Sequence, residues 1–196
     1  NSKSISQLFA KLSASMQPTS PSSKTLINAL EKIEFDQFKS FIPKIFESNA
    51  VDLLIHGNWS RQSADTIITD IKKVFVNKLS DNNQVKISCN DIHGKGTLTL
   101  PMALPAHDHA AVLYYPMLNK DLRTVALTML TNQLLSPIFF QEMRTEKQYG
   151  YLVGVGFIPI NRYPGIAFYI QSPHTDSVTL TIAMNEFIAR SSDFID

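Results

Sequence analysis

The sequence predicts an α+β (mixed α/β) fold in which helices are layered on a largely antiparallel sheet. Apolar residues recur at helical spacing along residues 5–16 and, as one continuous apolar stripe, along residues 60–75. Two segments rich in branched and aromatic residues, 151–158 and 165–171, are joined by a loop with a proline at each end, which favours a hairpin. The two kinds of pattern in one chain are the basis of the predicted fold class.

Further helices are predicted by the same spacing and by the residues at their ends. Pro43 should kink or divide a helix over residues 38–46, because proline lacks the N–H that an inner helical turn uses. Ser60 is expected to cap the helix that follows it. The remaining helices are predicted over residues 26–33, 122–144 and 176–188, the last with its cap inside residues 172–176.

The helix over residues 122–144 contains a proline of its own. Pro137 is expected to restart this helix with Ser136 as the cap, since proline suits the first turn. Gly150 is expected to stop it, because glycine is the usual residue just past a helix end.

Other short segments have the composition of strands. Residues 51–55 are branched and apolar and end at a turn-forming group, so they predict a buried strand. Residues 97–100 and 110–115 also read as strands, and residues 85–87 as a possible addition. The glycines of the run 154–156 lie within a predicted strand, where they indicate a bulge or a close backbone approach and not a nucleotide-binding loop.

A polar stretch divides the chain. Residues 80–96 carry turn-forming groups at both ends, so we place a linker there, with one domain over residues 1–79 and another over residues 97–196. The chain begins without a methionine and ends soon after a helical pattern that lacks an evident cap, so we expect it to be a piece of a longer protein.

Composition limits the classes of partner. The 18 Lys and Arg residues balance 17 Asp and Glu residues, so no net positive field favours nucleic acid or a membrane surface. No apolar run is long enough to span a bilayer, and we expect a soluble protein whose compartment, periplasmic or cytoplasmic, stays open. Cys89 is the single cysteine, which excludes an internal disulfide framework and a cysteine-rich zinc cluster.

The histidines do not form a recognisable zinc motif. A peptidase zinc site commonly uses two histidines one helical turn apart and a third ligand, and neither His-Glu-x-x-His nor His-x-x-Glu-His occurs. His107 and His109 would share one face of a strand, but a third ligand is not evident nearby. The favoured interpretation of this pair is a polar entry to a strand.

Arg144 and Tyr151 are the polar pair with the clearest chemical use. Arg144 ends a predicted helix and Tyr151 begins a predicted strand, so both are expected at the same edge of the sheet. An arginine fork can hold a peptide carbonyl or carboxylate, and a tyrosine hydroxyl can donate to an oxygen that gains charge in acyl transfer. Spacing alone favours the structural interpretation, in which Arg144 complements the helix dipole and Tyr151 packs.

The same region contains, in this order, Leu134, Pro137, Phe140, Arg144, Gln148, Gly150, Tyr151 and residues 168–172. This run resembles the fourth domain of insulinase-like zinc metallopeptidases, the pitrilysin or inverzincin group. Upstream, residues 41–43, 54–58 and the helix after Ser60 resemble the end of the third domain of that family. The two likenesses occur in the family's order and together extend over nearly the whole chain.

The resemblance implies a division of labour. In the family, an arginine and a tyrosine seven positions later reach the substrate near a zinc ion that another domain holds, so Arg144 and Tyr151 are the implied catalytic and substrate-binding residues. Phe140 matches an aromatic residue that lines the substrate pocket, and Tyr149 departs from a commoner leucine. The implied partners are peptide substrates in a closed chamber and the N-terminal zinc-binding half of the same polypeptide. The chain itself is expected to bind no zinc and to be inactive alone.

Two other expectations follow. The alternative function is an inactive insulinase-like scaffold or partner subunit, because the same domains occur in such proteins. A third option is an unrelated peptide-binding α/β domain, which would require both likenesses to be coincidence. Self-association of the chain is also expected, because a divided domain leaves apolar surface uncovered.

Overall fold

The computed structural model describes residues 4–46, 51–75, 88–92, 94–103 and 108–194. The chain forms two compact units, one made of Asn1–Ser23 with Ile87–Asp196 and the other of Lys24–Lys86. The mixed α and β character is confirmed by the helices and the antiparallel sheet that follow. The proposed division into family domains at residues 80–96 stays a prediction.

The regular elements described in the unit of residues 24–86 are all helices. Its elements are α2 (Ser23–Leu30), α3 (Phe35–Phe41), the 3-10 helix η1 (Ile42–Phe46) and α4 (Arg61–Phe75). The α-helix gives way to the 3-10 helix just before Pro43, which confirms the predicted division. Ser60 caps α4, since its Oγ accepts the backbone N–H of Ser63 at 3.1 Å.

The strand predicted over residues 51–55 is wrong. These residues have no regular structure, and the Leu54 side chain is 91% exposed. A strand needs a neighbouring strand to pair its backbone groups, and none of the described residues pairs with this segment. The apolar composition alone therefore did not make a strand.

The other unit is built on a three-stranded antiparallel sheet of β1 (His109–Pro116), β2 (Leu152–Phe157) and β3 (Gly165–Ser172). The strand order is β1-β3-β2, which puts β3 at the centre and confirms the hairpin of β2 and β3. Residues 97–100 are not a strand, contrary to expectation, because they pair with no other described segment. Residues 85–87 lie outside the described residues.

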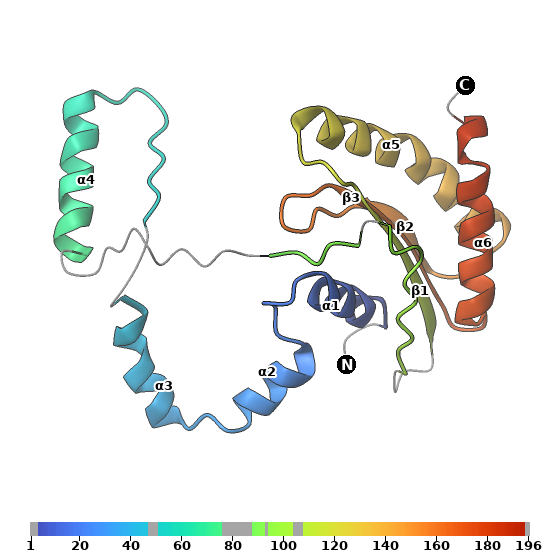
Figure 1. Cartoon of the computed structure of the whole chain (residues 1–196), viewed down its shortest axis with the longest axis horizontal. Helices are drawn as coiled ribbons and strands as arrows, with labels where there is room; N and C mark the ends of the chain where they lie inside the picture. The colour runs from blue at the N-terminus through green and yellow to red at the C-terminus, as the bar shows by residue number, and fades with distance from the viewer. Residues whose placement is uncertain (1–3, 47–50, 76–87, 93, 104–107, 195–196) are drawn as a thin grey trace. The chain divides into compact units, whose positions relative to one another are not determined.

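Helices cover both faces of this sheet. α5 (Leu122–Phe140) and α6 (Ser177–Ala189) lie on one face, and α1 (Ser4–Met16) lies on the other (Figure 1). Successive side chains of β3 point to opposite faces of the sheet, as expected for a strand. Phe168 points into the core under α5 and α6, whereas Tyr169 meets the ring of Phe9 of α1 edge-on, with ring centroids 5.6 Å apart.

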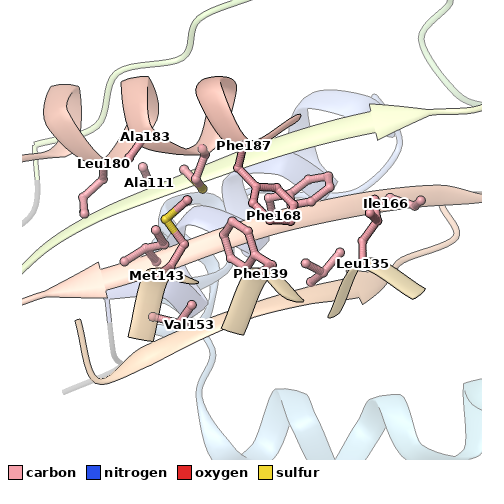
Figure 2. Packing of buried hydrophobic residues seen from close by; sticks show 13 residues of the cluster. Ala111, Leu135, Phe139, Met143, Val153, Ile166, Phe168, Leu180, Ala183 and Phe187 are labelled. Carbon is pink, nitrogen blue, oxygen red and sulfur yellow. The ribbon is translucent and has the colours of Figure 1, made fainter. Parts of the chain in front are cut away.

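The core under α5 and α6 is centred on three aromatic rings. Phe139 of α5 contacts Phe168 of β3 at 5.4 Å and Phe187 of α6 at 5.0 Å between ring centroids, both edge-to-face (Figure 2). Edge-to-face pairs of this kind add about 0.5–1.5 kcal/mol to the stabilisation from burial. The contacts join one residue from each helix to the central strand, so they fix the helices on the sheet.

α5 does not restart at Pro137. The helix is continuous through this proline, contrary to expectation, and Ser136 does not begin a new element. Leu135 and Phe139 are both buried in the core cluster, so packing holds the helix together where one backbone hydrogen bond is missing. The cap of α5 is Asp121, whose Oδ1 accepts the N–H of Thr124 at 2.9 Å.

Gly150 is not the stop of this helix either. α5 continues into a π-helical turn, η2 (Gln141–Glu146), and the left-handed residue after it is Gln148, with φ of 51°. Gly150 is needed for space instead, because a Cβ at this position would overlap the carbonyl oxygen of Gln171 in β3. The glycine therefore lets the chain enter β2 close against the central strand.

Leucines on α5 are exposed, among them Leu127, Leu130 and Leu134 at 51%, 52% and 42%. An apolar stripe of this kind is a typical surface for association. Self-association of the chain stays a prediction.

Gly150→Ala should lower the free energy of unfolding by about 1–3 kcal/mol, the usual cost of overpacking, because its methyl group would meet backbone atoms that cannot rotate away. Urea denaturation measures this change. The matched control is Gly156→Ala, where a Cβ would lie 3.6 Å from Ile158 in ordinary contact, and its effect should stay within about 1 kcal/mol. Equal effects of the two substitutions would show that Gly150 has no special steric role.

Candidate functional site

The candidate site lies where the π-helical turn leads into the sheet. In η2 the N–H of Lys147 donates to the carbonyl of Glu142 at 2.9 Å, the i to i+5 spacing of a π-helix. This wide turn brings Arg144 back toward the start of β2, where its Nη1 donates to the Gly150 carbonyl at 2.7 Å. Single π-helical turns are frequently found at functional sites. The guanidinium thus holds the backbone immediately before Tyr151.

An ion-paired glutamate fixes the same turn. Glu142 accepts from Lys147 at 2.7 Å and from Arg190, just past α6, at 2.8 Å. Partial burial by itself would raise the pKa of Glu142, but the hydrogen bonds from the two cations outweigh it and lower the pKa below its ordinary value. The carboxylate therefore stays charged at neutral pH and ties η2 to the end of α6.

Tyr151 belongs to a hydrogen-bonded cluster at one end of the sheet. Its hydroxyl donates to Oδ2 of Asp108 at 2.7 Å, and Nε2 of Gln171 donates both to the Tyr151 oxygen at 2.6 Å and to Asp108 Oδ2 at 2.8 Å. Asp108 immediately precedes β1, Tyr151 precedes β2 and Gln171 lies near the end of β3. The antiparallel pairing brings these three ends together.

The first turn of α1 anchors this cluster from the far side. The N–H of Ile5 donates to Oε1 of Gln171 at 3.1 Å, and Oγ of Ser4 donates to the carbonyl of Asp108 at 3.3 Å. Ser4, Ile5 and Gln171 are all buried, whereas the Tyr151 side chain is 48% exposed. The cluster thus has a buried base and a half-exposed tyrosine.

The hydroxyl of Tyr151 is held in its protonated form. The hydrogen bond to Asp108 raises the pKa of Tyr151, partial desolvation and the Asp108 charge raise it further, and the bond from Gln171 acts weakly in the opposite direction. An ordinary tyrosine already has a pKa of about 10. The phenol is therefore a hydrogen-bond donor at physiological pH.

The structure brings Arg144 and Tyr151 to the same end of the sheet through Gly150, as the sequence led us to expect. Phe140 is the last residue of α5 and is 47% exposed, one turn before Arg144. Tyr149 is partly buried against the core cluster, with the Lys147 ammonium 5.9 Å from its ring centroid. The Tyr149 ring thus packs on the core side of the run, with the Lys147 cation near its face.

Sequence reasoning missed Asp108 and Gln171 as parts of the site. In the sequence Gln171 is only one member of the run 168–172 that carries the resemblance, although a polar residue that follows a branched and aromatic run is a signal in itself. Asp108 had no local signal, because its contacts to Tyr151 and Gln171 span 43 and 63 residues.

Gly154 leaves room for a side chain of the neighbouring strand, and not for a backbone as we expected. A Cβ at Gly154 would lie 2.5 Å from the hydroxyl oxygen of Tyr169 on the neighbouring strand. The run has no bulge, since Leu152–Phe157 pairs with β3 without interruption.

Within the described ranges, His, Cys, Asp and Glu side chains form no group of three that could hold a metal ion. His109 is exposed at the start of β1, and His107 lies outside the described residues. Among the described helices, none is long and apolar enough to cross a membrane.

Comparison with known proteins places the chain in a family context. A family model described as "PQQ synthase PqqF-like, C-terminal lobe domain 4" matches residues 130–196, which include Arg144 and Tyr151. The chain is 26% identical over 161 residues to insulin-degrading enzyme of Homo sapiens and 27% identical over 178 residues to the A-factor-processing enzyme of Saccharomyces cerevisiae. It is 23% identical over 171 residues to a Schizosaccharomyces pombe protein described as a candidate zinc protease.

These matches cover most of this chain and a small part of each relative. They span 76%, 87% and 82% of the chain, but about one sixth (16–17%) of the relatives' own lengths. Together with the family model they support an insulinase-like C-terminal region, which confirms the resemblance inferred from the sequence.

We predict that the chain alone does not retain a stoichiometric amount of zinc and does not cleave peptides. The reason is the missing group of three ligands in its described part. Metal analysis after chelator treatment, zinc addition and gel filtration measures the first, and a quenched fluorescent peptide the second. A retained equivalent of zinc together with peptide cleavage would contradict the division of labour argued from the sequence.

Proposed function

We propose that this chain is the substrate-binding, non-zinc-binding portion of a zinc metallopeptidase that hydrolyses peptides inside a closed chamber. The observation that carries the proposal is the Arg144 to Gly150 hydrogen bond of 2.7 Å, which holds a cation against the backbone just before the half-exposed Tyr151. The likeness to proteins named as proteases supports the peptidase class.

Tyr151 would stabilise the oxygen of the scissile carbonyl. A phenol with a raised pKa is a neutral donor, and such a donor strengthens its hydrogen bond as the oxygen gains charge. Tyr151 has a single proton, which goes to Asp108 in this structure, so the hydroxyl must turn from Asp108 to the substrate. The contact would be made at little structural cost because Tyr151 is half exposed.

Arg144 would position the peptide. A guanidinium has five N–H donors in a fixed plane, and the bond to Gly150 uses Nη1, so further donors are available for a peptide carbonyl or carboxylate. Phe140, exposed one turn earlier, would give the pocket an apolar wall for a substrate side chain.

The metal would come from another part of the polypeptide. A bound zinc ion would supply an activated water for attack on the peptide bond. The described residues do not fit a three-ligand zinc site, so the chain's own steps are to bind the peptide, to orient it and to donate to its carbonyl.

Tyr151→Phe in the full-length protein should lower kcat roughly a hundred- to a thousandfold, the usual effect of losing one such donor, about 2.7–4 kcal/mol. Peptide hydrolysis measures the loss, and a thermal melt of the same variant separates it from unfolding. A variant that turns over like wild type but melts earlier would make Tyr151 a packing residue. A wild-type protein without peptidase activity would favour an inactive scaffold or partner subunit.

Arg144→Ala should instead act mainly on KM, because an interaction made equally in the ground state and the transition state leaves kcat nearly unchanged. We expect a rise of roughly tenfold or more, as for a charge-assisted hydrogen bond. Arg123→Ala on the exposed start of α5 is the matched control for the lost charge and should leave KM unchanged. A fall in kcat with no change in KM would instead assign Arg144 to the chemical step.

A further inference from the structure

Gln171 is the most constrained polar side chain of the cluster. It is 2% exposed, and its amide makes three hydrogen bonds, two as donor and one as acceptor. The N–H of Ile5 requires the oxygen of the amide on its side, so the two N–H groups must point to Asp108 and Tyr151. A side chain fixed on three sides and packed in the central strand cannot follow Tyr151 if the tyrosine moves.

The bonding of the Tyr151 oxygen suggests a division of roles. The oxygen accepts from Gln171 and donates its proton to Asp108. When the proton turns to a substrate, the bond from Gln171 can persist, since it uses a lone pair of the oxygen and not the proton. The bond to Asp108 must break at that moment. Asp108 still keeps the N–H of Gln171 as a partner for its carboxylate.

We propose that Gln171 is a positioning residue that holds the Tyr151 hydroxyl oxygen in place for the substrate, and that Asp108 accepts the hydrogen bond of this hydroxyl while the site is empty. The proposal rests on the function proposed for Tyr151. It explains why a buried glutamine stands in the central strand, where an unpaired amide would be costly. It also explains how an exposed tyrosine keeps one orientation.

Turnover of the full-length protein tests the first half of this proposal. Gln171→Met is similar in size and removes both N–H donors, so it should lower kcat about tenfold, as expected for one lost hydrogen bond. In the Tyr151→Phe background the same change should cause no further loss, because the oxygen it positions is absent. An equal loss in both backgrounds would mean that Gln171 acts on the fold and would overturn the proposal.

Ser172→Ala is the matched control. Ser172 is the next residue of β3, is fully buried, and its Oγ accepts the N–H groups of His174 and Thr175. Loss of the Ser172 hydroxyl should lower the melting temperature about as much as Gln171→Met does, while kcat stays at the wild-type value. A drop in kcat here equal to that of Gln171→Met would also overturn the proposal, because loss of buried polar contacts anywhere in β3 would then suffice.

A spectroscopic measurement on this 196-residue chain is independent of activity. With ¹³Cζ-labelled tyrosine, the spectrum of Tyr151→Phe identifies the Tyr151 signal among the six tyrosines. Gln171→Met should shift and broaden that signal, and Ser172→Ala should not. If Gln171→Met fails to fold, Gln171→Asn keeps a polar amide but shortens its reach, and it should give the same shift.

The two failures can be told apart. If Tyr151→Phe keeps its full turnover, the proposed function of Tyr151 is wrong, and the ¹³C signal alone decides whether Gln171 positions the ring. An unchanged Tyr151 signal in the folded Gln171 variants overturns the positioning role whatever the kinetics show.

Discussion

The contact of Phe168 with the two aromatic rings above it organises the larger unit. Phe168 lies on the central strand, and its neighbours Phe139 and Phe187 come from α5 and α6. Once this ring points toward the helices, the strand's two-residue period decides the direction of every other side chain of β3. Ile166 and Ile170 then enter the same core, while Tyr169 and Gln171 face α1. The polar cluster is therefore a consequence of how the apolar core is packed.

The backbone between α5 and β2 sets the relative positions of Arg144 and Tyr151 on this packed sheet. A regular helix end would leave Arg144 and Tyr151 with no fixed relation, but the π-helical turn and the left-handed Gln148 fold the chain back on itself. Gly150 then passes close to the backbone of Gln171, where a larger residue has no room. These backbone features let the Arg144 guanidinium donate to the Gly150 carbonyl and the buried Gln171 amide donate to the Tyr151 hydroxyl.

The electrostatics of the site favour hydrogen-bond donation by a neutral Tyr151 phenol over transfer of its proton. Tyr151 has a raised pKa and a carboxylate as its resting partner, so its proton is held firmly at neutral pH. Glu142 is kept charged by two cations and stabilises the turn that presents Arg144. Under the proposed function, this site would bind and polarise a carbonyl, and an activated nucleophile would have to come from elsewhere.

The sequence by itself determined the helices with clear periodicity, the hairpin of β2 and β3, and the placement of Arg144 and Tyr151 at one end of the sheet, because these signals are local or follow a short motif. It failed where the outcome depends on a distant partner. Residues 51–55 have the composition of a strand but find no strand to pair with, and Pro137 does not interrupt a helix whose neighbours Leu135 and Phe139 are held in the core. Asp108 and Gln171 entered the site only through the tertiary structure, because hydrogen bonds between residues 20 to 63 positions apart depend on strand order and register, which no local pattern records.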